Sequence, residues 1–333
     1  MSPQVARLLS LLITLGLLVS PVLGAIHNSD QSRPQLVVSD NGVFLFDSNT
    51  LIKRWQRLTD QQTFAPALLD DRLLVSGSRG LYAIDLQQGD ILWHLPGKHL
   101  GFPVVVYGDT AYLASRDGNL SAIDSSSGAH LWQVRFPGWV YPPAQAGDLL
   151  FTGGSDATLW AVDSRSGHIV WSRSLGQELV YSPAVLTDGQ VVVTTFNREV
   201  LSFDRSGRLL WRHSYPAIMK TPVISGKQLI FSGLDPVLRA VDADNGRELW
   251  QRRLPEPLAV GLVSQQGMIL AALESGRIWV LESATGALQQ EYRLPGLSVA
   301  GPRIHNGEML GFIHAFGGPK AVVATRLKLS DSK

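Results

Sequence analysis

No cysteine occurs among the 333 residues of this sequence. Its absence excludes disulfide bonds, thiolate metal ligands, a cysteine nucleophile and a lipid attached to cysteine. Neither sign of charge is in excess, because 29 Lys and Arg residues stand against 28 Asp and Glu residues. A basic surface that holds nucleic acid or anionic lipid is therefore not expected. The catalytic patterns Gly-x-Ser-x-Gly and His-Glu-x-x-His and a phosphate-binding glycine loop are missing as well.

The longest apolar run lies near the amino terminus, at Leu8–Val19, and is followed by the small residues of 21–25. A helix of that length spans about 18 Å, well short of the roughly 30 Å hydrocarbon core of a bilayer. Arg7 precedes the run, so we predict a secretory signal peptide at residues 1–24, cleaved after Gly24. An uncleaved membrane anchor is the alternative. The predicted mature protein is periplasmic and begins with a short segment, residues 25–34.

The rest of the chain contains a repeat, Ala-x-Asp-x-x-x-Gly-x-x-x-Trp, whose clearest copies are residues 83–93 and 122–132. Weaker copies lie around Asp47, Asp204 and Glu282. The repeated tryptophans are Trp55, Trp93, Trp132, Trp171, Trp211 and Trp250, at steps of 38, 39, 39, 40 and 39 residues. The acids and glycines of the clear copies are Asp85, Asp124, Asp163 and Asp242, with Gly89, Gly128, Gly167 and Gly246.

Each repeat of about 39 residues holds four short runs typical of β-strands, joined by tight turns such as Arg79-Gly80 and Asp117-Gly118. A period near 40 with four strands predicts an all-β fold, a β-propeller of four-stranded blades. The predicted domain is residues 35–328, followed by a tail at 329–333. Its length favours eight blades, with the amino-terminal and carboxy-terminal segments closing the ring; seven blades are the alternative.

The repeat has a structural explanation. Asp can accept hydrogen bonds from backbone N–H groups in a turn, and Gly can adopt positive φ. Trp offers about 200 Å² of surface to pack between blades. Six acids at one repeat position cannot share an active site, so we predict no catalytic residues. His94 and His99 have no acidic residue close in sequence, and we predict no metal site.

The motif resembles the tryptophan-docking repeat of pyrroloquinoline-quinone (PQQ)-type propellers, and the resemblance covers nearly all of 35–328. One such family, the quinoprotein dehydrogenases, implies bound PQQ and calcium, but its members are roughly twice as long and many carry adjacent cysteines. Another, the BamB-like proteins, implies an eight-bladed periplasmic scaffold for assembly of outer-membrane β-barrel proteins. BamB-like proteins carry a lipidated cysteine after the signal peptide, which this chain lacks, so no direct lipid anchor is expected.

A candidate binding face is predicted where the loops that lead into each first strand meet the hairpins between strands two and three. Counting back from the proline that opens each first strand, the residue three before it is usually apolar, whereas the residue two before it varies. The variable residues include Phe64, Tyr141, Tyr181 and Lys220. We predict a face made by Phe64, Phe102, Trp139, Tyr141, Tyr181, Lys220, Arg79, Arg116 and Arg198. Aromatic and Arg clusters are typical of protein-binding surfaces; the alternative is that the aromatic side chains only plug the channel mouth.

The sequence therefore favours a non-catalytic scaffold that resembles BamB and mediates protein–protein interaction, without a cofactor. Its expected partner is a periplasmic or outer-membrane protein, and the resemblance points to the barrel-assembly machinery. Through such a partner the protein would lie at the outer membrane. A small PQQ-dependent dehydrogenase with calcium is the first alternative. A carbohydrate-binding propeller that stacks sugars on Trp139, Tyr141 and Tyr181 is the second.

Overall fold

The computed structural model describes residues 35–39, 42–47, 50, 52–97, 100–294, 303–305, 308–314 and 322–328. The predicted signal peptide at 1–24, the segment 25–34 and the tail 329–333 lie outside the described residues. All regular structure in the described part of the chain is β-strand. No helix found there is long and apolar enough to cross a membrane.

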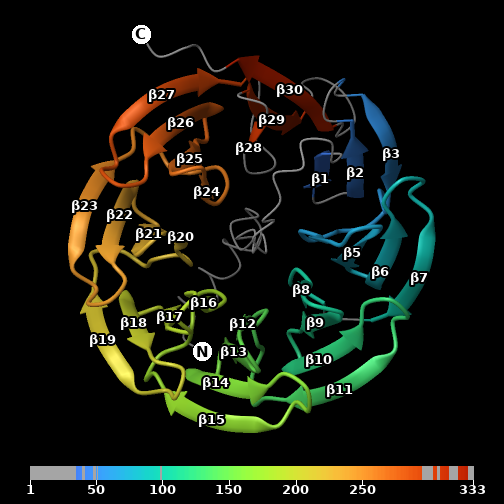
Figure 1. Ribbon diagram of the computed structural model, residues 1–333, viewed down its shortest axis with the longest axis horizontal. Coiled ribbons are helices and arrows are strands. Elements are labelled where there is room, and N and C mark those ends of the chain that lie inside the picture. Colours follow the sequence, from blue (N-terminus) through green and yellow to red (C-terminus); the bar gives the residue numbers. More distant parts are fainter. Residues whose placement is uncertain are drawn as a thin grey trace.

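The strands form eight antiparallel sheets that follow one another around a ring (Figure 1). Six sheets have four strands, and a sheet of three strands lies at each end of the described chain. The first three-stranded sheet is β1 (Gln35–Ser39), β2 (Gly42–Phe46) and β3 (Lys53–Arg57). The last is β28 (Arg303–His305), β29 (Glu308–His314) and β30 (Val322–Lys328).

Three four-stranded blades occupy the first half of the ring. They are β4 (Ala67–Leu68), β5 (Arg72–Gly77), β6 (Gly80–Asp85) and β7 (Ile91–Pro96); β8 (Val105–Tyr107), β9 (Thr110–Ala114), β10 (Asn119–Asp124) and β11 (His130–Arg135); and β12 (Ala144–Ala146), β13 (Leu149–Gly153), β14 (Thr158–Asp163) and β15 (Ile169–Ser174). The order of strands in each sheet follows the chain, as the repeat predicts.

Three further blades complete the four-stranded set. They are β16 (Ala184–Val185), β17 (Val191–Thr194), β18 (Glu199–Phe203) and β19 (Leu209–Ser214); β20 (Val223–Ser225), β21 (Gln228–Ser232), β22 (Val237–Asp242) and β23 (Glu248–Arg253); and β24 (Val263–Gln265), β25 (Met268–Ala272), β26 (Arg277–Glu282) and β27 (Leu288–Arg293). In every blade the first strand lies nearest the centre and the last strand lies on the perimeter (Figure 1). The prediction of an all-β propeller with four-stranded blades is confirmed for these six sheets.

The burial of each strand follows from this arrangement. The third strand of a blade packs against both neighbouring blades, and β6 is accordingly buried along nearly its whole length. The fourth strand is on the perimeter, and in β7 exposed positions alternate with half-buried ones. A continuous apolar run therefore marks an inner strand, and a mixed run marks the outer strand.

A β-bulge recurs at one place in the repeat. The register between the third and fourth strands shifts just before the turn acid, between Ala83 and Ile84 in the β4–β7 blade and between Ala161 and Val162 in the β12–β15 blade. A bulge adds twist and ends regular pairing. It therefore lets the chain leave the ladder and form the Asp-x-x-x-Gly turn before the outer strand begins.

Candidate functional site

The repeated tryptophans lie at the contacts between neighbouring blades, which we call the seams. Each indole reaches the Asp-x-x-x-Gly turn of the following blade. Its Nε1–H donates to the carbonyl oxygen of the residue after the turn acid, as in Trp132 to Ser164 at 3.0 Å. The same bond joins Trp55 to Leu86, Trp171 to Arg205, Trp211 to Ala243 and Trp250 to Ser283. Each of these five indoles thus latches its blade to the next.

The turn glycine is required by the indole that covers it. Gly167 has φ of +75°, and a Cβ built there would lie 2.6 Å from Cε3 of Trp132. Gly89, Gly128 and Gly246 have positive φ and the same kind of contact with Trp55, Trp93 and Trp211. A side chain at this position would meet both backbone strain and the ring. The glycine and the tryptophan of successive repeats therefore form one unit.

The turn acid holds its own loop. In the β8–β11 blade, Oδ1 of Asp124 accepts hydrogen bonds from the backbone N–H groups of Ser126 and Ser127, at 3.1 and 2.8 Å. The serine hydroxyls donate to the same oxygen. These hydrogen bonds lower the pKa of Asp124 to about 2, with the Ser126 hydroxyl contributing most. Bonds to a carboxylate favour its ionised form.

The other turn acids are arranged in the same way. Asp85, Asp163 and Asp242 each accept two backbone N–H bonds on Oδ1. Asp85, Asp124, Asp163 and Asp242 each stand on a different blade of the ring. Among the described residues, no group of three or more His, Asp or Glu side chains is placed to hold a metal ion.

Trp93 departs from the pattern, because its Nε1 is buried without a hydrogen-bond partner. Its ring still covers Gly128, where a Cβ would lie 2.9 Å from Cε3. At this seam the contact between the indole ring and the turn glycine is therefore present, but the hydrogen bond of the indole is not.

A second seam contact was missed by the sequence reasoning. Two residues after the tryptophan, Arg173 crosses to the next blade and donates from Nε to the carbonyl oxygen of Gly207 at 2.7 Å. Arg57 reaches Gln88 O at 3.4 Å, and His213 lies 3.2 Å from Asn245 O. The guanidinium of Arg173 also lies over the Trp171 ring at 5.2 Å. The recurrence of Arg or His two residues after Trp is the sequence signal that could have revealed it.

The predicted binding face is largely closed to solvent. Phe64, Phe102, Tyr141, Tyr181 and Lys220 are all buried, at 7, 7, 4, 2 and 7% exposure. They therefore pack inside the molecule, and the expectation that they are presented at the centre of one face is corrected. Among the hydrophobic and aromatic members of the set, only Trp139 is half-buried, and its Nε1 has no hydrogen-bond partner.

Burial changes the acid–base behaviour of these side chains. The ring centroids of Phe102 and Tyr141 are 5.2 Å apart in an edge-to-face contact. Desolvation raises the pKa of Tyr141 and Tyr181 far above the ordinary range of a phenol. Desolvation also lowers the pKa of Lys220, against a smaller opposing effect of Glu274. Burial disfavours the charged form of any of these groups.

The register of Tyr181 also differs from the sequence alignment. The backbone N–H groups of Tyr141 and Lys220 donate to Gly153 O and Ser232 O, at equivalent places of their blades. In the blade between them Val180 makes that bond, to Thr194 O. Tyr181 therefore lies one residue beyond the position of Tyr141 and Lys220, because proline spacing does not fix the loop length.

The arginines of the predicted face are its exposed part. Arg79, Arg116 and Arg198 all lie in hairpins between the second and third strands and are exposed. Arg79 pairs with Asp60 at 2.5 Å, with both side chains more than half exposed. Arg198 adopts φ of +68° at the turn. Solvent on this face therefore meets charged hairpins and not the aromatic cluster.

Comparison with known proteins agrees with this architecture. The model of a family described as outer membrane protein assembly factor BamB, PQQ_2, matches residues 80–182 and 166–305. The chain belongs to this family. It is a BamB-like β-propeller repeat protein of the PQQ type, as the tryptophan repeat predicted.

Individual relatives are distant. An outer membrane protein assembly factor BamB of Bordetella pertussis is 31% identical over 113 residues, 32% of this chain and 29% of that protein. The protein of the same name from Nitrosomonas eutropha is 29% identical over 105 residues, 29% of this chain and 25% of its own length. The chain thus aligns with less than a third of either relative.

Two solved structures share the fold over most of the chain. BamB from Moraxella catarrhalis superposes with a TM-score of 0.67 at 18% identity, covering 88% of this chain and 96% of that one. The computationally designed Ika8 protein gives a TM-score of 0.73 at 14% identity, covering 90 and 97%.

Proposed function

We propose that this protein is a non-catalytic propeller scaffold of the cell envelope that holds a protein partner during assembly of outer-membrane proteins. The observation that carries the proposal is the family match, which covers residues 80–305 and bears the description of a barrel-assembly factor. The relatives from Bordetella pertussis and Nitrosomonas eutropha carry the same description. Under this proposal, residues 35–328 form one eight-bladed domain whose ring is closed by the sheets β1–β3 and β28–β30. Residues 1–24 direct export to the periplasm.

The difference between repeated and variable positions within the chain supports a scaffold. The repeated Asp, Gly and Trp residues form the turns and the seams, as where the Trp132 ring covers Gly167. What varies between blades lies in the hairpins and on the perimeter. Variation on a fixed frame is what a binding scaffold requires, because loops carry recognition while the core carries stability.

The test is in-cell cross-linking of the tagged full chain, followed by purification and mass spectrometry. We expect a component of the barrel-assembly machinery to be recovered. The variant Arg116→Glu with Arg198→Glu, which reverses charge on the exposed hairpins, should reduce that recovery. The matched control is Arg165→Glu with Arg247→Glu, two exposed arginines on the turns at the opposite ends of the strands. Recovery of no assembly component with the unaltered chain would overturn the proposal.

A further inference from the structure

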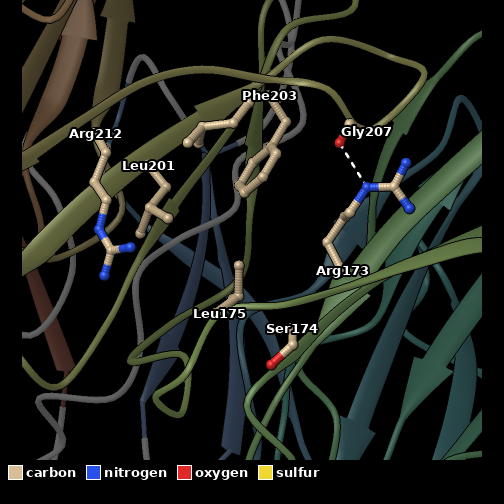
Figure 2. Close-up of a pocket in the computed structure, with 8 residues that line it drawn as sticks. Arg173, Ser174, Leu175, Leu201, Phe203, Gly207 and Arg212 are labelled. Atoms are coloured by element: carbon tan, nitrogen blue, oxygen red, sulfur yellow. Dashed lines mark hydrogen bonds between the residues drawn. The ribbon is translucent and has the colours of Figure 1, made fainter.

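A cavity of about 310 Å³ lies at the perimeter between β15 and the blade β16–β19 (Figure 2). Leu175, Leu201 and Phe203 form its apolar wall and are 3–4% exposed. Arg173 and Arg212 stand on opposite sides of it (Figure 2). It is therefore an apolar cleft between two cations, and it lies in a seam and not in the central channel.

The cleft is open because a large side chain is missing there. Leu201 is three residues before the turn acid Asp204. At the same place, the other four-stranded blades carry Tyr82, Ser121, Trp160, Arg239 and Trp279, of which Ser121 alone is also small. Trp160 fills the preceding seam, with its ring centroid 5.3 Å from that of Phe136, and Arg239 is 4% exposed. In these two blades an indole or a guanidinium occupies the position, whereas at Leu201 the space is left open.

Exposed aliphatic residues stand at the start of the outer strands on both sides of the cleft, as they do on other outer strands such as β7, where Ile91 and Leu92 are 49 and 47% exposed. The two outer strands beside it, β15 and β19, each begin with a pair of exposed aliphatic residues. Ile169 and Val170 are 45 and 54% exposed, and Leu209 and Leu210 are 48 and 41% exposed. Of these residues Leu209 lines the cleft itself and extends its apolar wall to the surface, as is typical of binding pockets.

The charge around the cleft is positive. Arg173 donates Nε, Nη1 and Nη2 to the carbonyl oxygens of Gly207, Ser172 and Ser206, which leaves two of its five N–H donors for other acceptors. No carboxylate of the described residues lies within salt-bridge distance of Arg173, whereas Arg212 forks onto Glu199. On the Arg173 side the cleft therefore has a cation that no described carboxylate compensates, and it suits an anionic occupant.

We propose that this cleft binds an aromatic side chain presented by an acidic, extended segment of a partner protein. The ring would take the place that Trp160 and Trp279 fill in other blades, and a neighbouring carboxylate would accept from Arg173. Aromatic anchors in desolvated pockets contribute most to protein interfaces, and complementary charge fixes their orientation. The inference rests on the proposed scaffold role, but it places the partner on the perimeter and not at the channel mouth.

The test uses the full mature chain and a fluorescein-labelled peptide of sequence Asp-Glu-Asp-Trp-Asp-Glu-Asp, with binding followed by fluorescence anisotropy. We expect replacement of its Trp by Ala to weaken binding at least about tenfold, as for an interface anchor. Leu201→Trp fills the cleft from within and should weaken binding of the Trp peptide by a similar factor. Leu131→Trp, which adds an indole at an exposed position of β11, is the matched control and should leave binding unchanged.

A second measurement on the unaltered protein covers the case in which Leu201→Trp does not fold. The peptide carries benzoylphenylalanine in place of Trp, and the cross-link is mapped by mass spectrometry. Adducts on Leu175, Leu201 or Phe203 support the proposal. Equal affinity of the Trp and Ala peptides, absence of binding, or adducts elsewhere would overturn it. Because the assay needs no assembly component, its failure is distinct from failure of the proposed cell-envelope function.

Discussion

The latch between tryptophan and turn glycine can be tested by two glycine-to-alanine substitutions that differ in one respect. Gly167 and Gly176 both have φ of +75°. A Cβ at Gly167 would lie 2.6 Å from the Trp132 ring, whereas a Cβ at Gly176 would meet nothing within 4 Å. Gly176→Ala therefore measures the cost of the backbone conformation alone, and Gly167→Ala adds the seam contact.

The expected magnitudes follow from these two contributions. A left-handed alanine costs about 1–2 kcal/mol, offset by about 0.4–1 kcal/mol from the lower entropy of the unfolded chain. We therefore expect Gly176→Ala to lower the free energy of unfolding by about 1 kcal/mol or less. Forcing a methyl group against the indole adds about 1–3 kcal/mol of overpacking. Gly167→Ala should thus lose about 1–4 kcal/mol, always more than Gly176→Ala.

The measurement is thermal unfolding of both variants, followed by circular dichroism under identical conditions. For a chain of this size, 1 kcal/mol corresponds to a change of about 2 °C in Tm. Gly167→Ala should therefore melt clearly below Gly176→Ala, and Gly176→Ala should lie close to the unaltered protein. Equal losses in the two variants would refute the reasoning, because only backbone strain would then matter and the indole contact would contribute nothing.

Two further predictions concern single side chains. Trp132→Phe should destabilise the protein by about 1 kcal/mol more than Trp93→Phe. Only Trp132 loses a hydrogen bond, to Ser164, while Trp93 loses a buried donor without a partner. Urea unfolding midpoints measure the difference, and a larger loss for Trp93→Phe would contradict the prediction. Lys220→Met should raise Tm at pH 7, because burial of the ammonium lowers its pKa and disfavours the charged form in the folded state. Between the lowered pKa and the usual 10.5 the unfolded chain binds more protons, so the unaltered protein gains stability as pH rises and the advantage of Lys220→Met should shrink there; an advantage that grows with pH would count against the burial of a charged Lys220.

The seams could be predicted from sequence because they are a property of the repeat. Trp132 and Gly167 recur at a fixed spacing, and only a stacked arrangement of sheets uses one indole per repeat in the same way. The partner of each indole, in the turn of the following blade, also follows from that stacking. The Arg173 contact was missed because its position carries Leu95 and Val134 in other repeats, so the pattern is not continuous.

The buried cluster of Phe64, Phe102, Tyr141, Tyr181 and Lys220 could not be placed from sequence because it depends on loops. Proline spacing puts Tyr141 and Tyr181 in equivalent positions. The structure shows instead that Val180 makes the backbone hydrogen bond equivalent to that of Tyr141. Burial of Lys220 is equally invisible, since a lysine in a polar loop is normally solvated. Sequence spacing predicts the position of a residue within a strand, where successive side chains alternate between the two faces of the sheet. It does not predict positions in the loops between strands, whose lengths vary.

The perimeter cleft shows that differences between repeats, as well as their common residues, carry information. A position that is filled by Trp160 and Trp279 in two blades and by Leu201 in another is a local loss of volume on a constant frame. Relaxation seldom closes such a space in a well-packed protein, because surrounding side chains are held by their own contacts. The neighbouring indole of Trp171 is held in its own seam by the hydrogen bond to Arg205 O at 3.1 Å. In a repeat protein the recognition sites are therefore best sought where one copy lacks what its neighbours have, and at Leu201 that difference falls beside Arg173, whose charge no described carboxylate neutralises.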